Sequence, residues 1–140
     1  MNPRINPRSA QTGSISEAAV EWDLLRQGFN VLSPAVVTRY DRVVEVAEKN
    51  YVRVQVKTAR IDARDGNLRV TYDTPYNPSE VDLIAVYSPS NGQVYYIPID
   101  DIPEGAKGFT LRTTERIYNR KKRAGLTAND YKKFPMEVVK

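Results

Sequence analysis

Two stretches between residues 40 and 58 carry polar side chains of the kinds that bind a metal ion and a phosphate. Asp41 opens a valine-rich run, and Gln55 and Lys57 alternate with valines in a second run. Side chains alternate between the faces of a strand, so Gln55 and Lys57 share one face and the valines share the other. If the runs pair through a turn near Asn50, Asp41 faces the same place. A carboxylate, a neutral oxygen and a lysine that converge are what a magnesium-dependent phosphodiesterase needs.

The composition narrows the chemistry further. The chain has 140 residues and contains no cysteine and no histidine. Disulfides, structural zinc sites, thiol nucleophiles and histidine-based acid-base mechanisms are therefore excluded. Any reaction must run on carboxylates, lysine, hydroxyl groups or a hard cation bound through oxygen.

The pattern of apolar residues predicts the elements that would position these groups. An apolar stripe predicts a helix over residues 14–27, which Gly28 ends. We expect strands over residues 29–32, 41–46, 51–58, 68–72 and 110–117, a hairpin of residues 81–87 and 94–98, and a short helix over residues 128–133 capped by Thr127. This order predicts an α/β fold in which helices pack on a mixed sheet.

Charge is distributed unevenly along the chain. The net charge is +4, but residues 61–111 carry eight acidic and three basic side chains, whereas residues 112–140 carry nine basic and three acidic ones. A basic C-terminal segment over residues 112–140 favours a polyanionic partner, although a solvated helix face is the plain alternative. The expected phosphate contacts are Arg116, Arg120, Lys121, Lys122 and Arg123, with Arg4 and Arg8 from a flexible basic arm over residues 1–13.

Length and hydropathy predict a single domain over residues 1–140. At 41% hydrophobic residues, the chain is large enough for one core. No apolar run approaches the length of a membrane span and the N-terminus lacks an apolar signal core, so we expect no membrane association and a cytoplasmic or nucleoid location.

At this point the residues resemble a known family. A glutamate on the first helix (Glu17), an aspartate opening the second strand (Asp41) and Gln55-x-Lys57 on the third resemble the PD-(D/E)XK nuclease superfamily, also called the restriction-endonuclease-like fold. Size, basic arm and element order look most like the archaeal-type Holliday junction resolvases, including phage-encoded relatives. Group I intron homing endonucleases are the nearest competitor, because they also carry Gln-x-Lys. The resemblance covers roughly residues 12–100.

The resemblance implies a mechanism and a substrate. A Mg²⁺ ion, for which Mn²⁺ substitutes, is held by Asp41, by Glu17 directly or through water, by Gln55 and by the main-chain carbonyl of Val56. Lys57 positions the scissile phosphate and the attacking water. The enzyme is expected to resolve four-way DNA junctions by paired phosphodiester hydrolysis as a homodimer, without a small-molecule cofactor, in a cytoplasm or a phage-infected host. A hydroxyl before the second strand, from Ser33 or Thr38, is expected to contact DNA.

Several alternatives remain open at this level. Gln55 stands where resolvases carry an acid, so Glu45 is a possible substitute, four residues after Asp41 on the same strand face. Glu17 also fits a helix capping box with Ser14 as the cap. The hairpin of residues 81–97 is a candidate dimer surface. A catalytically silent DNA-binding relative and an RNA-directed nuclease are the remaining readings.

Overall fold

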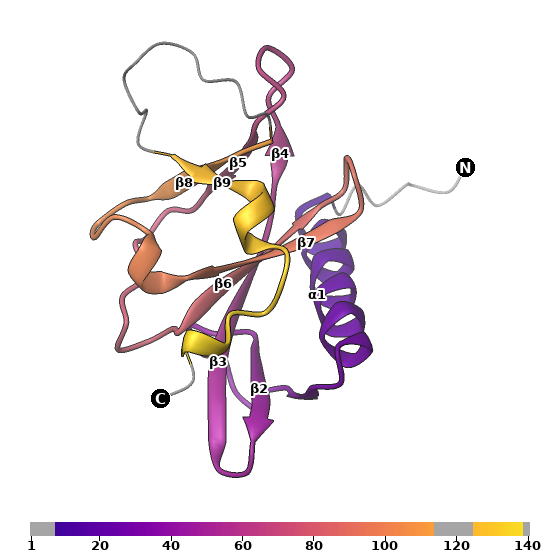
Figure 1. Cartoon of the computed structure of the whole chain (residues 1–140), viewed down its shortest axis with the longest axis vertical. Helices are drawn as coiled ribbons and strands as arrows, with labels where there is room; N and C mark the ends of the chain where they lie inside the picture. The colour runs from indigo at the N-terminus through magenta and orange to yellow at the C-terminus, as the bar shows by residue number, and fades with distance from the viewer. Residues whose placement is uncertain (1–7, 114–124, 139–140) are drawn as a thin grey trace.

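The computed structural model describes residues 8–113 and 125–138, and its first element is a single α-helix, α1 (Arg8–Arg26). Two sheets follow. The first contains β1 (Asn30–Leu32), β2 (Arg42–Ala47), β3 (Asn50–Thr58), β6 (Leu83–Ser88) and β7 (Gln93–Pro98), in the order β1-β2-β3-β6-β7. Only the β3–β6 pair is parallel, so this sheet is mixed. The predicted α/β architecture, a helix followed by strands in mixed sheets, is confirmed (Figure 1).

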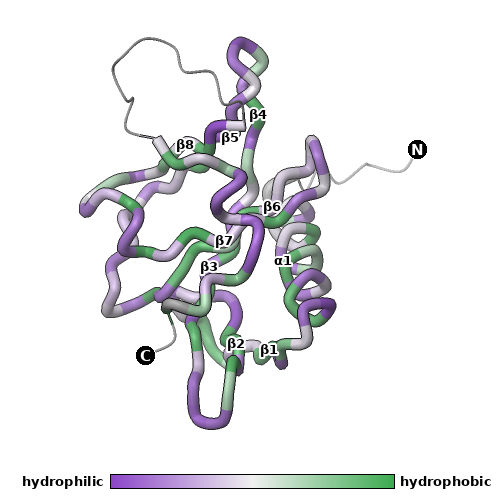
Figure 2. The backbone as a smooth tube through the Cα atoms, in the orientation of Figure 1, coloured by the Kyte–Doolittle hydropathy of each residue, from purple (hydrophilic) through white to green (hydrophobic). Residues whose placement is uncertain are grey.

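A second sheet lies beyond the end of β3. It contains β4 (Arg60–Ile61), β5 (Leu68–Thr71), β8 (Gly108–Arg112) and β9 (Leu126–Thr127), in the order β4-β5-β8-β9. Three short 3₁₀ helices complete the described elements: η1 (Ile99–Asp101), η2 (Ala128–Tyr131) and η3 (Met136–Val138). Figure 2 shows hydrophilic residues at the tips of the β2–β3 and β4–β5 hairpins, which extend away from the rest of the chain.

The first sheet is covered on both faces. Val20 and Leu24 of α1 belong to one buried cluster together with Val54 and Val56 of β3. A second cluster joins residues of β6 and β7 to residues of the second sheet. Strand β6 contributes alternate residues to the two clusters, as expected of a strand that is buried on both faces. The apolar side chains of the β6–β7 hairpin thus fill the core of one chain, and a dimer surface on this hairpin stays a prediction.

The start of the first helix differs from the prediction. The helix begins at Arg8 and not near residue 14, so residues 8–13 are not part of a flexible arm. No helix breaker interrupts residues 8–12, and an isolated glycine such as Gly13 is tolerated inside a helix. Ser14 consequently lies inside α1, and the capping-box interpretation of Glu17 is wrong.

The C-terminal elements are shorter than predicted. Strand β8 ends at Arg112, and the remainder of the strand expected over residues 110–117 lies outside the described residues. The helix expected over residues 128–133 is the 3₁₀ helix η2, and the Thr127 side chain makes no capping hydrogen bond. Within the described ranges, no helix is long and apolar enough to cross a membrane.

Candidate active site

The candidate site lies where β2 begins beside the middle of β3. The register pairs Arg42, the first residue of β2, with Val54. One residue earlier, the Asp41 amide donates to the Val54 carbonyl at 2.8 Å, and Asp41 Oδ2 accepts the Val56 amide at 2.9 Å. The Asp41 carboxylate thus takes the place of a main-chain partner and is fixed against β3.

The same edge brings Gln55 beside Asp41. The main-chain polar groups of Val54 and Val56 point toward β2, because residues two apart in a strand face the same neighbour. The residues before Asp41 do not pair with β3. The Val56 carbonyl therefore faces an edge of β3 that β2 does not cover. Gln55 Nε2 donates to that carbonyl at 3.3 Å. Asp41 and Gln55 therefore meet at the main chain of one residue, Val56, the first at its amide and the second at its carbonyl.

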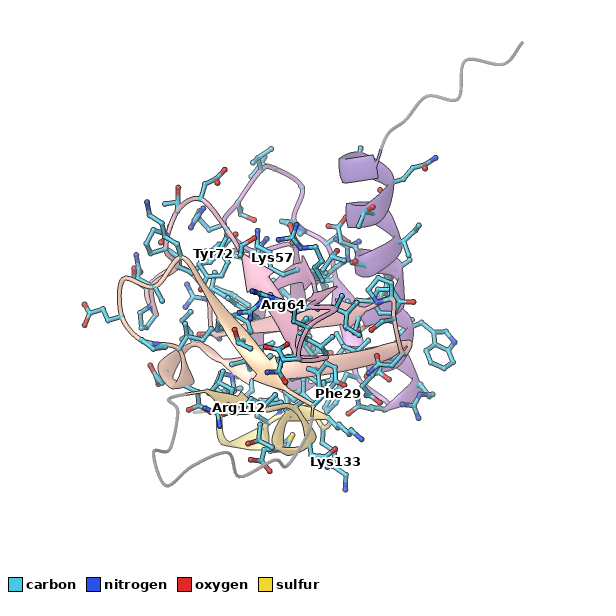
Figure 3. All side chains as sticks on the ribbon, turned by 90° about the horizontal axis from the view of Figure 1, so that it is seen from above. Phe29, Lys57, Arg64, Tyr72, Arg112 and Lys133 are labelled. Carbon is cyan, nitrogen blue, oxygen red and sulfur yellow. The ribbon has the colours of Figure 1, made fainter. Side chains whose placement is uncertain are left out.

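Lys57 extends from β3 on the face opposite α1. Its Nζ lies 5.3 Å from the centre of the Tyr76 ring and 5.8 Å from that of Tyr72, distances at which a cation and an aromatic face attract each other. Figure 3 shows Lys57 and Tyr72 side by side. The partial burial of Tyr72 raises the pKa of its hydroxyl. Among the described residues, the Lys57 ammonium group thus contacts two aromatic rings and makes no ion pair with a carboxylate.

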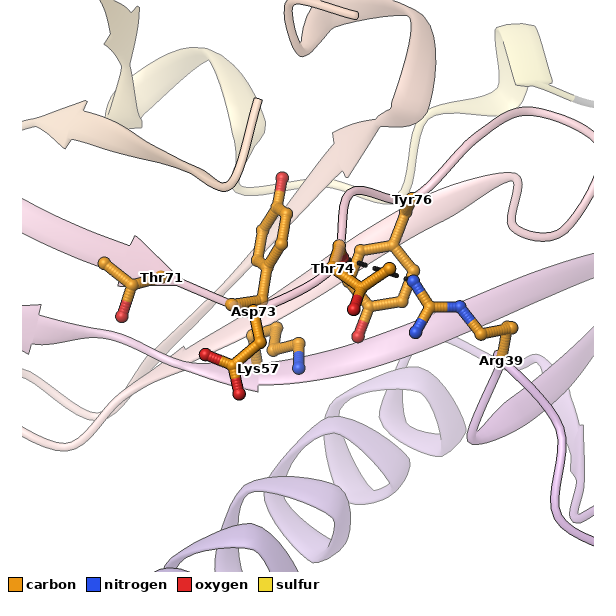
Figure 4. Close-up of a pocket in the computed structure, with 7 residues that line it drawn as sticks. Arg39, Lys57, Thr71, Asp73, Thr74 and Tyr76 are labelled. Atoms are coloured by element: carbon orange, nitrogen blue, oxygen red, sulfur yellow. Dashed lines mark hydrogen bonds between the residues drawn. The ribbon is translucent and has the colours of Figure 1, made fainter. Parts of the chain in front are cut away.

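A pocket of about 480 Å³ opens beside Lys57. Figure 4 shows Lys57 and Asp73 extending into the same space. The lining residues are Arg39, Lys57, Thr71, Tyr72, Asp73, Thr74 and Tyr76. Asp73 is exposed and was not singled out from the sequence, because it stands in a proline-rich turn with no periodic pattern around it.

Arg39 ties this pocket to the segment that leads into Asp41. Its guanidinium lies 4.0 Å from the centre of the Tyr76 ring and donates to the carbonyls of Thr74 at 3.2 Å and Pro75 at 3.0 Å. Its Nε is 3.3 Å from Glu80 Oε2. The sequence offered no signal for this role, since the partners of Arg39 lie 35 or more positions away.

Glu17 approaches from the other side of the sheet. Arg42 shares the face of its partner Val54, which is the face that α1 covers. Arg42 Nη1 donates to the Asp41 carbonyl at 2.7 Å and lies 3.5 Å from Glu17 Oε1, so one nitrogen joins the two residues. Arg42 Nε is 3.6 Å from Glu21 Oε2. Sequence reasoning missed Arg42, because nothing in the strand pattern distinguishes it from a solvent-facing arginine.

A hydrogen bond between the neighbours of Glu17 and Lys57 fixes α1 to β3. Ser16 Oγ and Thr58 Oγ1 are 2.5 Å apart, and Ser16 is buried. Each partner is adjacent in sequence to a candidate site residue. The bond therefore sets the position of Glu17 along the edge of the sheet.

The structure also places three other residues that the sequence singled out: Glu45, Ser33 and Thr38. Glu45 pairs with Tyr51 near the far end of the β2–β3 hairpin and accepts a hydrogen bond from Asn30. Four strand residues span about 13 Å, so Glu45 does not reach the place where Asp41 and Gln55 meet. Ser33 is exposed, whereas the Thr38 hydroxyl donates to the Tyr40 carbonyl at 2.6 Å.

Most of the predicted DNA contacts lie outside the described residues. Arg8 is the first residue of α1. The other members of the set lie outside the described residues: Arg4, Arg116, Arg120, Lys121, Lys122 and Arg123. Their contacts with phosphate stay predictions.

The donor set at this edge suits a hard cation. In the described ranges, no three acidic side chains come together in a metal-binding group. The available oxygens are one carboxylate on Asp41, the Val56 carbonyl and the Gln55 amide oxygen, which a half-turn of the amide brings to this place. Mg²⁺ is commonly bound through one or two carboxylates and keeps several waters, so these few ligands are compatible with it.

Comparison with protein-family models gives the class of protein to which this fold and edge belong. The model of the PD-(D/E)XK endonuclease family matches residues 8–134. The chain belongs to this family, and the resemblance drawn from Glu17, Asp41, Gln55 and Lys57 is confirmed at the level of the family.

Two solved structures are similar to the chain. A bacterial homing endonuclease, I-Ssp6803I, is 26% identical, with a TM-score of 0.63 and coverage of 80% of each chain. Hjc, a Holliday junction resolvase from the archaeal hyperthermophile Archaeoglobus fulgidus, is 16% identical, with a TM-score of 0.49 and coverage of 72% of this chain and 84% of that one. Among curated proteins, a search finds no match.

Proposed function

We propose that this chain is a divalent-metal-dependent DNA endonuclease whose active site is the edge formed by Asp41, Gln55, Val56 and Lys57. The observation that carries the proposal is the fixing of the Asp41 carboxylate on the Val56 amide, next to the Gln55 amide and the Val56 carbonyl. The oxygen ligands thus lie together where β3 extends beyond its pairing with β2.

Each residue of the site has a distinct role in the proposal. Asp41 supplies the anionic ligand, and Gln55 and Val56 supply neutral oxygens. A bound divalent cation supplies an acidified water and neutralises charge that develops on the phosphate. Lys57, held over two tyrosine rings, contributes a fixed positive charge that orients the phosphate.

Two DNA substrates are compatible with this site. The 26% identity to a homing endonuclease over 80% of both chains ranks cleavage of a linear duplex at a defined sequence first. Gln55-x-Lys57 favours the same ranking, because homing enzymes of the superfamily carry this pair. Resolution of four-way junctions by a homodimer stays a prediction and ranks second. A cytoplasmic location stays a prediction.

One gel experiment tests both the activity and the substrate. The full chain is incubated with Mg²⁺ and labelled linear duplex library, four-way junction, nicked and flap DNA. We expect Asp41→Asn and Lys57→Ala to lower the cleavage rate at least about a thousandfold, since each removes a group that acts on the reacting phosphate. Binding measured by gel shift in Ca²⁺ is expected to survive in both variants.

The pattern of products assigns the substrate. Discrete double-strand breaks in a subset of the linear library support the homing type, and symmetric paired nicks in the junction support the resolvase type. Specific binding without cleavage in either Mg²⁺ or Mn²⁺ would instead support the catalytically silent relative. Arg64→Ala is a suitable control, because Arg64 is exposed and pairs with Asp62 at the β4–β5 hairpin.

A further inference from the structure

The contacts of Arg42 distinguish it from the other arginines near the site. Its side chain is only 18% exposed and lies between two carboxylates of α1, Glu17 and Glu21, which are 32% and 41% exposed. Both contacts, at 3.5 and 3.6 Å, are longer than the usual N–H···O distance of about 2.9 Å. The ion pairs are therefore loosely made, although the guanidinium is largely enclosed.

One nitrogen of Arg42 is incompletely satisfied. Arg42 Nε is buried and has no hydrogen-bond partner among the described residues. A buried donor without a partner is unfavourable, so this arrangement of Arg42 has little to hold it when a better partner for Glu17 arrives. The firm contact of Arg42 is the 2.7 Å hydrogen bond to the Asp41 carbonyl, which leaves the guanidinium beside the site even if Glu17 moves away.

We propose that Arg42 is a built-in counter-ion for Glu17 that competes with the divalent cation for this carboxylate and so lowers the cation affinity of the site. This inference rests on the proposed function, because it takes the Asp41 edge as the cation site. Glu17 already touches the nitrogen that holds the Asp41 carbonyl. In this proposal Glu17 exchanges Arg42 for a cation bound at Asp41, or for a water on that cation.

Arg42 and the neutral side chain of Gln55 act in the same direction, because both lower the negative charge of the site. A site with the Asp41 carboxylate and a neutral amide has a low negative charge, and Arg42 lowers it further by neutralising Glu17. In the apo protein the pair keeps Glu17 from being an isolated, partly buried anion. Glu17 therefore has a partner in the cation-free and in the cation-bound site. The strength of its pair with Arg42 determines the cation concentration at which Glu17 changes partner.

Calorimetric titration with Mn²⁺ and Mg²⁺ tests the proposal through a double-mutant cycle of Arg42→Gln and Glu17→Gln. We expect Arg42→Gln to tighten cation binding by about tenfold or more, because a unit charge is removed close to the site. In the Glu17→Gln background the same substitution should change the affinity by less than about threefold, since the competition acts through Glu17. Arg53→Gln is the matched control, because Arg53 is also a partly buried arginine on this sheet but pairs with Asp82.

Three results would overturn the proposal. An equal gain in both backgrounds would mean that Arg42 acts only through general electrostatics. Weaker binding in Arg42→Gln would mean that it positions Glu17 for the cation. No change in Arg42→Gln would remove the role altogether. Loss of cation binding in Asp41→Asn keeps these outcomes separate from failure of the proposed function, which would show as no Asp41-dependent cation binding in the wild-type chain.

A measurement on the wild-type chain avoids the risk that a substitution at Arg42 prevents folding. Arginine side-chain ¹⁵N NMR is recorded while Mg²⁺ is added. We expect the Arg42 Nε–H signal to shift with the same midpoint as the calorimetric titration, whereas the Arg53 signal stays in place. An unmoved Arg42 signal during Asp41-dependent cation binding would overturn the proposal and leave the proposed function standing.

Discussion

At the scale of the residue, Gln55 determines how much negative charge the candidate site offers. We expect Gln55→Glu to tighten Mg²⁺ binding by roughly tenfold, or about 1.4 kcal/mol, because it adds a second anionic oxygen beside Asp41. Calorimetry measures the affinity directly. Gln93→Glu is a matched control, because Gln93 Nε2 also donates to the carbonyl of the next residue, at 2.8 Å, but on β7. Equal tightening in both variants would argue against Gln55 as a ligand.

The sequence located the polar groups of this site but not their cationic neighbours. Alternation along β3 predicted that Gln55 and Lys57 share a face, and the contacts of Lys57 with Tyr72 and Tyr76 agree with it. Arg42 and Arg39 could not be found in this way. Their partners come from α1 and from residues 74–80, and side-chain pairing across such separations depends on the packed fold and not on local periodicity.

At the scale of the element, a side-chain hydrogen bond near the site adds to the apolar packing of α1 on β3. We expect Ser16→Ala to lower the free energy of unfolding by about 1–2 kcal/mol, because the half-buried Thr58 hydroxyl loses its partner. The cation affinity should also weaken if the bond positions Glu17. Urea denaturation and calorimetry measure the two effects. Wild-type stability in Ser16→Ala would show that the bond contributes nothing.

Ser14→Ala tests where the helix begins. As a cap residue Ser14 would stabilise the helix by about 1 kcal/mol, so its loss would be destabilising. The structure places Ser14 inside α1 at an exposed position, where alanine is the better helix former by up to about 0.5 kcal/mol. We therefore expect a small gain in stability in urea. A decrease of about 1 kcal/mol in the free energy of unfolding would instead support Ser14 as the cap residue at the start of the helix.

Elements with strong periodicity were predicted well, and those set by tertiary contacts were not. The strands around residues 41–46, 51–58, 81–87 and 94–98 agree with β2, β3, β6 and β7 to within about two residues. The division into two sheets was not visible, because β4 contains only Arg60 and Ile61 and pairs with β5 through a turn. The packing partners of the apolar β6–β7 hairpin were also not predicted, since composition alone does not identify the surface a strand packs against.

At the scale of the whole molecule, a polar network around the buried Asp23 and Tyr96 joins three parts of the chain. The Tyr96 hydroxyl on β7 donates to the Asp23 carboxylate on α1, and Gln27 Nε2 donates to the same carboxylate at 2.8 Å. Gln27 Oε1 accepts the Phe134 amide at 3.5 Å, which brings in the C-terminal segment. Arg26 Nη2 lies 2.7 Å from Asp23 Oδ1. The Tyr96 hydroxyl therefore joins β7 to α1 through Asp23.

Alkaline pH is expected to weaken this network. Burial, with the hydrogen bond to Asp23, raises the pKa of the Tyr96 hydroxyl far above its usual value. A tyrosine with a raised pKa in the folded state contributes stability that is fully present below the unfolded pKa of about 10 and is lost as pH rises further. We expect Tyr96→Phe to cost about 1–3 kcal/mol near pH 8, because Asp23 loses a buried donor.

The comparison of the two chains isolates Tyr96 from the other groups that titrate at high pH. Urea denaturation of wild type and Tyr96→Phe is measured from pH 8 to pH 11. The difference in stability should shrink above pH 10, because in wild type unfolding then releases the proton that the folded Tyr96 retains, whereas phenylalanine has none to release. A difference that stays constant across this range would mean that the hydroxyl has an ordinary pKa and that the network does not link folding to pH.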